Sequence, residues 1–217
     1  GDTEIFYDTQ PEKGTPTGKF NDLVDSFRLI EVWNNVFMEF NKTPEGKYEP
    51  LVAKNVDTGM GLERTTAVVN GKDNIFATDL FAPILSEIRQ QVANFDEKAS
   101  RIVADHVRTA VFMIADGVVP SNTDRGYVLR RIIRRAIRFA DQMQADTEVA
   151  SKVAHVVIEK YKKVYPELEK NRDKIFTELN KEEEKFRKTL AQGLKEFEKN
   201  QDPFDLYQTF GFPIELT

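Results

Sequence analysis

Residues 56–64 (VDTGMGLER) carry the sharpest chemical signal in the sequence. They combine Asp57 at the end of a predicted strand, Gly59 and Gly61 one residue apart, and a helix that begins with unpaired amide groups. Such a turn suits an amino acid or a nucleotide phosphate, and Arg64 can neutralise phosphate or stack on a base. The alternative is an ordinary strand-to-helix turn with Asp57 as the helix cap. Asp57 and Arg64 together on either side of the glycines favour the ligand site.

Asn34 is a second candidate because it is a polar residue on an otherwise apolar strand face. Residues 29–41 alternate as a long central strand does, with large apolar side chains on both faces. A buried amide needs hydrogen-bond partners, which either the protein core or a ligand supplies. The strand pattern by itself favours an asparagine satisfied within the core.

The segment RGYVLRRIIRRAIRFA (residues 125–140) is a third signal, because a helix there carries arginines on one side and apolar residues on the other. The arginine arc consists of Arg130, Arg131, Arg134, Arg135 and Arg138, and the apolar arc of Leu129, Ile132, Ile133, Ala136, Ile137 and Ala140. No acid lies between Arg125 and Ala140, whereas residues 171–200 mix both signs of charge as a structural helix does. An unmixed arginine surface predicts contacts with nucleic-acid phosphates. The alternative is that these arginines pair with acids elsewhere in the chain.

Composition limits the remaining possibilities. The chain has 217 residues and a net charge of -5, so any site for a polyanion must be local. The absence of cysteine excludes disulfides and thiolate chemistry. His106 and His155 fall in separate predicted helices without a metal-ligand spacing, so no metal site is expected. Apolar runs are too short for a membrane span and the first residues do not resemble a secretion signal, so we expect a cytoplasmic protein with no membrane partner.

The elements that must position these residues change character along the chain. Strand and loop patterns reach to about residue 60, and helical periodicity follows, which predicts an α+β fold with a boundary between residues 80 and 100, placed at 90/91. The predicted helices cover residues 62–69, 96–115 with Asp96 as N-cap and Gly117 as stop, 125–142, 149–165 and 171–200. Two or three strands are marginal alone, so the sheet is expected to pack on helices or to belong to a larger sheet.

Four segments in order resemble the alanyl-tRNA synthetase family: EVWNNVFMEFN, VDTGMGLERTTAVV, ADHVRTAVFMIADGVVPSNTDRGYVLRRIIRRAIR and LYQTFGFPIELT. The resemblance covers essentially the whole chain. It implies that residues 1–90 are the C-terminal part of a class II catalytic domain, with VDTGMGLER as motif 3 on part of an antiparallel sheet. It also implies that residues 91–217 are a mostly helical tRNA-recognition domain.

The resemblance assigns ligands to the first group of residues. Asn34, Val36, Asp57 and Gly59 would bind alanine, with Asp57 on the ammonium group and Gly59 leaving room for only a methyl side chain. Gly61 and Arg64 would bind ATP, which brings Mg²⁺, and no protein-bound zinc is expected. Asp57 and Arg64 would serve catalysis by positioning and charge stabilisation, without a strong base.

The resemblance also assigns tRNA contacts. Asn122 matches an asparagine that approaches the G·U wobble pair in the acceptor stem of tRNA-Ala. Arginines beside it would hold phosphates, and this predicted set is Arg125, Arg130, Arg131, Arg134, Arg135 and Arg138. The family usually has YDTYGFP at the last motif, and its aspartate also reads the wobble pair. Here that position is Gln208, which keeps hydrogen bonding but brings no charge.

Compared with the family, the sequence starts after motifs 1 and 2. We therefore expect alanine-tRNA ligase chemistry to need a companion chain or upstream sequence that carries them, and the fragment alone to have little or no adenylation activity. One alternative is a non-catalytic module or split subunit that binds the tRNA acceptor stem. Another is a helical scaffold whose arginines bind acidic proteins.

Overall fold

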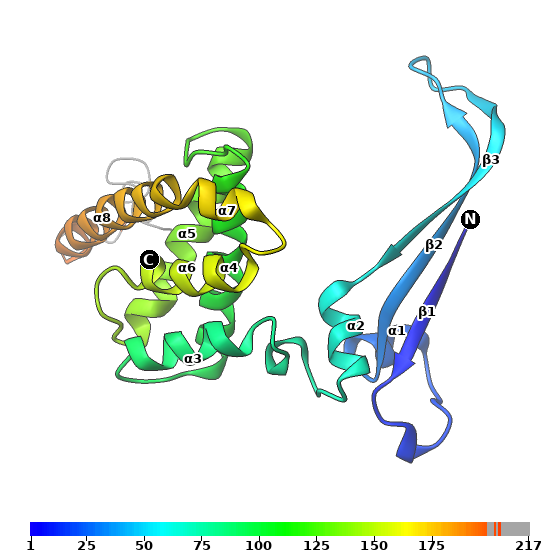
Figure 1. The fold of residues 1–217 in the computed structure, drawn as a ribbon, viewed down its shortest axis with the longest axis horizontal. Helices are drawn as coiled ribbons and strands as arrows, with labels where there is room; N and C mark the ends of the chain where they lie inside the picture. Colours follow the sequence, from blue (N-terminus) through cyan, green and yellow to red (C-terminus); the bar gives the residue numbers. More distant parts are fainter. Residues whose placement is uncertain (199–201, 203, 205–217) are drawn as a thin grey trace. The chain divides into compact units, whose positions relative to one another are not determined.

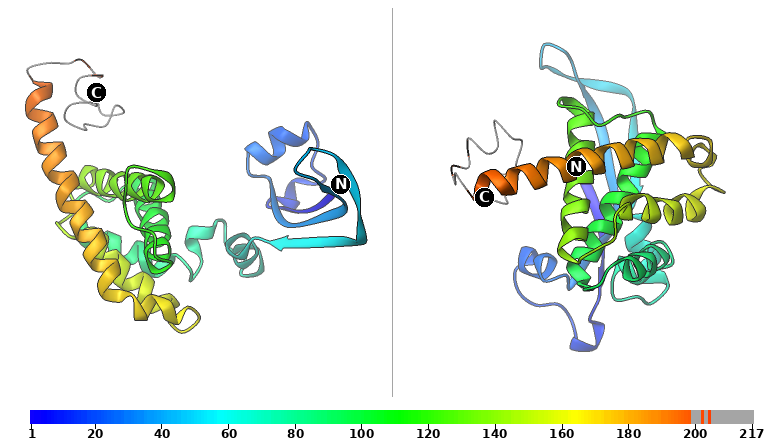
Figure 2. Two further views of the ribbon diagram at one scale, coloured as in Figure 1. Left: turned by 90° about the horizontal axis from the view of Figure 1, so that it is seen from above. Right: turned by 90° about the vertical axis from the view of Figure 1, so that its left-hand side faces the viewer.

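The computed structural model describes residues 1–198, 202 and 204, and the chain divides into two compact units, Gly1–Ala82 and Pro83–Thr217 (Figures 1 and 2). The predicted α+β class is confirmed, since the first unit holds a three-stranded antiparallel sheet and the second is built of helices. The elements are β1 (Asp2–Asp8), η1 (Pro11–Lys13), α1 (Phe20–Asp25), β2 (Leu29–Lys42), β3 (Tyr48–Met60), α2 (Leu62–Val69), η2 (Ile75–Ala77), α3 (Ala82–Gln91), α4 (Glu97–Ala115), α5 (Asp124–Gln142), α6 (Val149–Tyr161), α7 (Pro166–Lys170) and α8 (Arg172–Phe197). The predicted boundary at 90/91 falls at the end of α3, and the compact units divide between Ala82 and Pro83.

The sheet of the first unit has the order β1-β2-β3, with β2 in the centre as its two apolar faces predicted. A tight hairpin joins β2 to β3, in which the Thr43 N–H donates to the Lys47 carbonyl at 2.8 Å and the Gly46 N–H donates to the Thr43 carbonyl at 2.9 Å. Gly46 has a φ of 84°, a conformation that glycine adopts without a steric cost. Figure 1 shows β2 and β3 as a long curved ribbon followed by α2.

The end of β3 differs from the prediction. The sequence predicts a strand that ends at Val56–Asp57, followed by a glycine turn, but β3 continues to Met60. The reason is pairing with β2, which places Gly59 opposite Asn34 and Met60 opposite Trp33. Backbone hydrogen bonds to the central strand therefore carry the extended conformation through the first glycine.

Both faces of the sheet expose large apolar side chains. Val36, Phe37 and Phe40 on β2 and Val56 on β3 are among them. The structure contains well-buried aliphatic residues mainly in its helices, from Ile84 onward. Large apolar side chains exposed on a sheet are typical of a surface that another segment or protein covers.

The helical unit follows its sequence signals closely. Asp96 caps α4, with its Oδ1 accepting a hydrogen bond from the Ala99 N–H at 2.7 Å, and Gly117 follows the helix end with a φ of 93°. On α5 the buried residues recur at helical spacing, and they are Gly126, Leu129, Ile133, Ala136, Ile137 and Ala140. Ile132 of the predicted apolar arc is only half-buried, and Gly126 was not in that arc. Among the described residues, no helix has the length and apolar character to cross a bilayer.

One predicted helix is shorter than expected, and three α-helices were not predicted. The 149–165 helix ends at Tyr161, and α7 begins at Pro166, whose ring disfavours helical geometry at the residue before it. The helices α1, α3 and α7 were not predicted. The last segment of the family resemblance, LYQTFGFPIELT (residues 206–217), lies outside the described residues.

Arg172 at the start of α8 links this helix to α6 and α7 through ion pairs. Its guanidinium donates to Glu159 of α6 and to Glu169 of α7, each at 2.5 Å. The hydrogen bond from Lys162, followed by that from Arg172, lowers the pKa of Glu159 from 4.5 to about 2. The carboxylate therefore stabilises the fold in its ionised form.

This shift predicts a pH-dependent stability. A lowered pKa means that the contribution of Glu159 is complete above 4.5 and is lost as the pH falls toward about 2. We expect Glu159→Gln to lower the urea midpoint of the helical unit at neutral pH, and the difference from wild type to close across that acid range. Glu178→Gln on α8 is the control, since Glu178 has no ion pair within the described residues. A difference that stays constant with pH would contradict the assignment.

Candidate functional site

The register of β2 and β3 brings the predicted amino-acid-binding residues together. Asn34 lies opposite Gly59, and Val36 lies opposite Asp57. Side chains two residues apart on a strand point to the same face, and directly opposed residues share that face. All four positions therefore lie on one side of the two-strand ribbon, which sequence spacing alone did not show.

Asn34 has an unsatisfied amide oxygen. Its Oδ1 is buried and has no hydrogen-bond partner within residues 1–198, 202 and 204. A buried acceptor left unpaired costs roughly 1–3 kcal/mol. The structure therefore does not support an asparagine satisfied within the core, and an N–H donor from a ligand would remove this cost.

Asp57 and Gly59 lie within β3 and not at a helix cap. Gly61 is the N-cap of α2, and no side chain caps that helix, so the alternative that Asp57 caps it is wrong. A methyl group built on Gly59 would meet no atom within 4 Å. The face that carries Asn34 and Asp57 is thus open at its centre, where a small ligand could lie.

Arg64 is held at the start of α2 beside the same strands. Its Nη1 donates to the Glu31 carbonyl oxygen at 3.1 Å, and the side chain is 56% exposed. A methyl group on Gly61 would lie 3.6 Å from the Arg64 side chain, so the two residues are neighbours in space. The remaining guanidinium N–H groups can reach a phosphate in solvent.

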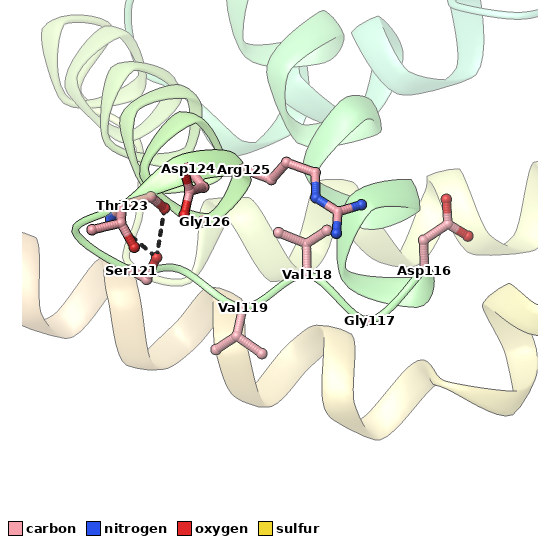
Figure 3. A pocket seen from close by; sticks show the side chains of 9 residues that line it. All are labelled: Asp116, Gly117, Val118, Val119, Ser121, Thr123, Asp124, Arg125 and Gly126. Atoms are coloured by element: carbon pink, nitrogen blue, oxygen red, sulfur yellow. Dashed lines mark hydrogen bonds between the residues drawn. The ribbon is translucent and has the colours of Figure 1, made fainter. Parts of the chain in front are cut away.

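The loop between α4 and α5 carries Asn122 and is fixed on the first turn of α5. The Ser121 N–H donates to the Gly126 carbonyl at 3.0 Å, and the Ser121 hydroxyl donates to the Thr123 carbonyl at 2.9 Å. A shallow pocket of about 270 Å³ opens beside this loop (Figure 3). Its lining residues are Asp116, Gly117, Val118, Val119, Ser121, Thr123, Asp124, Arg125 and Gly126. Arg125 extends over it on the side of Val118 in Figure 3.

The predicted arginine surface is divided by α8. The Arg134 Nε donates to the Glu182 carboxylate at 2.6 Å, and the Arg130 Nε lies 3.5 Å from the same oxygen. These side chains are only 22% and 15% exposed. The expectation of one unpaired arginine face is therefore wrong for Arg130 and Arg134, because the crossing helix supplies a carboxylate (Figure 2).

Arg131, Arg135 and Arg138 fit the expectation better. None of them has an ion pair in the part of the chain that the structure describes. Each guanidinium lies over an aromatic ring, Arg131 at 5.7 Å from the Tyr127 centroid and Arg138 at 5.2 Å from that of Phe139. Arg135 lies 5.8 Å from the same Phe139 ring. Their N–H donors remain available to an anion.

Glu182 was missed because residues 171–200 looked like a solvated helix. A signal was present, since Leu179 and Phe186 are buried and Glu182 and Glu183 fall between them at helical spacing. Glu182 is only 4% exposed. Gln208 lies outside the described residues, and among those described no group of three acids or histidines could hold a metal ion.

Comparison with known proteins supplies the family. Residues 2–217 match the family model of class II tRNA synthetases (A). The chain is 43% identical to an alanine–tRNA ligase of Thermotoga maritima over 100% of this chain and 27% of the relative. Similar enzymes of Borrelia hermsii and Pseudomonas entomophila are each 42% identical, over 100% and 99% of this chain and 39% and 26% of theirs. The chain thus spans a quarter to two-fifths of the length of these curated relatives.

Gly126 provides a test of the loop geometry. A methyl group there would lie 2.2 Å from the Ser121 Oγ and 2.5 Å from the Val119 carbonyl, closer than real contacts allow. We expect Gly126→Ala to lower the free energy of unfolding of the helical unit by about 1–3 kcal/mol, although alanine favours helices, because the loop must shift. Gly59→Ala is the control, with open space around it. Equal midpoints for both variants in urea unfolding would show that the loop is not clamped.

Proposed function

The chain belongs to the class II tRNA synthetase (A) family, and we propose that it is the part of an alanine-tRNA ligase that binds alanine and ATP in its first unit and the tRNA-Ala acceptor stem in its second. The observation that carries the first half is the β2–β3 register, which gathers Asn34, Val36, Asp57 and Gly59 on one face. The unpaired Asn34 oxygen supports it independently.

The chemistry proposed for this face follows from its donors and acceptors. The Asp57 carboxylate would hold the ammonium group of alanine, and the Asn34 oxygen would accept a hydrogen bond from the same ammonium group. Open space beside Gly59 would take the methyl side chain.

The reaction needs positioning more than proton transfer. The alanine carboxylate would attack the α-phosphorus of ATP, releasing pyrophosphate, and the terminal ribose hydroxyl of the tRNA would then take the alanyl group and release AMP. Asp57 would orient the amino acid, and Arg64 beside Gly61 would balance phosphate charge. Mg²⁺ would supply further charge neutralisation when bound with ATP.

We propose residues 1–90 as the end of the catalytic domain and residues 91–217 as the tRNA-recognition domain of a cytoplasmic enzyme. The exposed apolar residues of β2 and β3 support a further catalytic segment over the sheet, in the same polypeptide or a companion chain, that carries motifs 1 and 2. The alternative of a non-catalytic tRNA-binding module predicts no alanine-dependent pyrophosphate exchange even when that segment is supplied.

For the second unit we propose that Asn122 reads the wobble pair and that Arg125, Arg131, Arg135 and Arg138 hold phosphates. The support is their exposed or unpaired state within the described residues. Gln208 would add hydrogen bonds near the same base pair. We assign Arg130 and Arg134 a supporting role, because both already form ion pairs with Glu182.

The amino-acid site is tested by Asp57→Asn and Gly59→Ala in the ligase polypeptide that contains these residues. We expect Asp57→Asn to lower kcat/KM for alanine in pyrophosphate exchange by roughly 100-fold, since the ammonium group loses a charged partner. Gly59→Ala should raise KM for alanine by about tenfold while leaving stability unchanged. Glu49→Gln, with the same charge change on exposed β3, is the control. Alanine kinetics that match the control, or exchange at the full rate by these 217 residues alone, would refute the proposal.

The phosphate contacts are tested by replacing Arg131, Arg135 and Arg138 together with glutamine. Binding of tRNA-Ala to the chain should weaken, and the slope of log affinity against log salt should fall by about 2, since each lost phosphate contact removes roughly 0.7–0.9. The control replaces Lys163, Lys170 and Lys174 with glutamine, which removes the same charge. Equal effects of the two triple variants would favour a scaffold that binds polyanions without preference.

A further inference from the structure

We propose that Glu182 of α8 is a positioning residue that acts through Arg130 to set the orientation of the Asn122 side-chain amide. The inference rests on the proposed function of Asn122 as the residue that reads a base pair of the acceptor stem. It adds to that function a residue from a different helix, and it specifies which end of the asparagine amide faces the RNA.

The first step is the burial of Glu182. Its residue is only 4% exposed, and one of its oxygens accepts a hydrogen bond from the Arg134 Nε at 2.6 Å and lies 3.5 Å from the Arg130 Nε. The Arg134 guanidinium also lies 5.3 Å from the centre of the Phe186 ring. Two guanidinium groups one helical turn apart on α5 thus face one buried carboxylate, Arg134 through a hydrogen bond and Arg130 through an ion pair without one.

The second step runs from Arg130 to the loop. Its Nη1 donates a hydrogen bond to the Oδ1 of Asn122, and its Nη2 donates to the Pro120 carbonyl at 3.4 Å. The planar guanidinium therefore forms an ion pair with Glu182 on its Nε side, where the buried Nε has no hydrogen-bond partner among the described residues, and it donates hydrogen bonds to the loop through its two terminal nitrogens. A lysine could not make these contacts at the same time.

The third step concerns the asparagine amide. A guanidinium only donates hydrogen bonds, so the amide must present its oxygen to Arg130, and its NH₂ group is turned away. Asn122 itself is exposed. It therefore presents donors to a partner, which suits acceptor atoms such as pyrimidine O2 or purine N3 in the wide, shallow minor groove of RNA.

A role in stability alone does not account for the contacts of Glu182 as well as the positioning role does. Buried ion pairs are weak evidence for stability. In addition, α8 is joined to α5 by a second bridge, in which Arg187 donates to Asp141 at 2.5 Å and to Glu183 at 2.8 Å. The Glu182 pair is distinguished by its position, since it is the one that continues to Asn122.

The experiment measures discrimination and not affinity alone. The 217-residue chain is titrated with two acceptor-stem RNA hairpins that differ only in a G·U or a G·C pair, and the ratio of the two Kd values is the readout. We expect Glu182→Ala to reduce this ratio about tenfold, toward the value for Asn122→Ala, because a single base contact contributes roughly that factor. Glu184→Ala, which removes the same charge from an exposed position of α8, should leave the ratio unchanged. Any general electrostatic gain in RNA affinity is common to both variants and cancels in the ratio.

A double variant and a second substitution complete the test. Glu182→Ala added to Asn122→Ala should cause no further change in the ratio if both act at one contact. If the Glu182→Ala variant does not fold, the Kd ratio of the Arg130→Lys variant is measured instead. This substitution keeps the positive charge and removes the planar guanidinium that contacts both Glu182 and Asn122. A ratio unaffected by Glu182→Ala and Arg130→Lys, but lowered by Asn122→Ala, would overturn the positioning role and leave the proposed function standing. A wild-type chain that does not distinguish the hairpins, or an Asn122→Ala variant that distinguishes them normally, would refute both.

Discussion

The alternation of side chains along two paired strands is the constraint on which the amino-acid site depends. Asn34 and Asp57 share a face only because β2 and β3 pair with Asn34 opposite Gly59, and a slip of one residue would turn Asn34 to the other side. The Gly61 N–H, which donates to the Val32 carbonyl at 3.2 Å, supports the register at the site, whereas the hairpin pairs in a register that shifts between Met38 and Phe40. Backbone hydrogen bonds therefore position the site on a sheet whose side chains are largely exposed.

The helical unit depends on a different interaction, the pairing of buried carboxylates with arginines. Successive residues of a helix turn by about 100°, so Arg130 and Arg134, four apart, face α8, whereas Arg131, Arg135 and Arg138 lie on the neighbouring stripe. The first pair meets Glu182, and the second set meets no acid among residues 1–198, 202 and 204. The arginines of α5 therefore have two roles: one group pairs with Glu182 and contacts the loop, and the other remains available to an anion.

The sequence allowed much of the fold to be predicted where a local rule decides. The central strand, the start of α2 and the cap of α4 at Asp96 were all predicted, since alternation, glycine and capping act within a few residues. The extension of β3 to Met60 could not be, because it depends on pairing with β2. The contact between Glu182 and Arg134 could not be predicted for a similar reason, since these two residues are 48 positions apart in the sequence. Asn34 and Asp57 were recognised as chemically unusual, but only the register showed that they share a face.

The two sites offer opposite hydrogen-bonding character, and this follows from how each asparagine is held. The Asn34 oxygen has no hydrogen-bond partner among the described residues, and the exposed Asp57 carboxylate is an acceptor on the same face. This face therefore needs a hydrogen-bond donor. Asn122 has its oxygen bound by Arg130, so it presents N–H groups. A primary ammonium group supplies the donors that the first site needs, and the edge of an RNA base pair supplies acceptors for the second. The same residue type can therefore serve a small cation in one unit and a nucleic acid in the other, because the scaffold decides which end of the amide is left free.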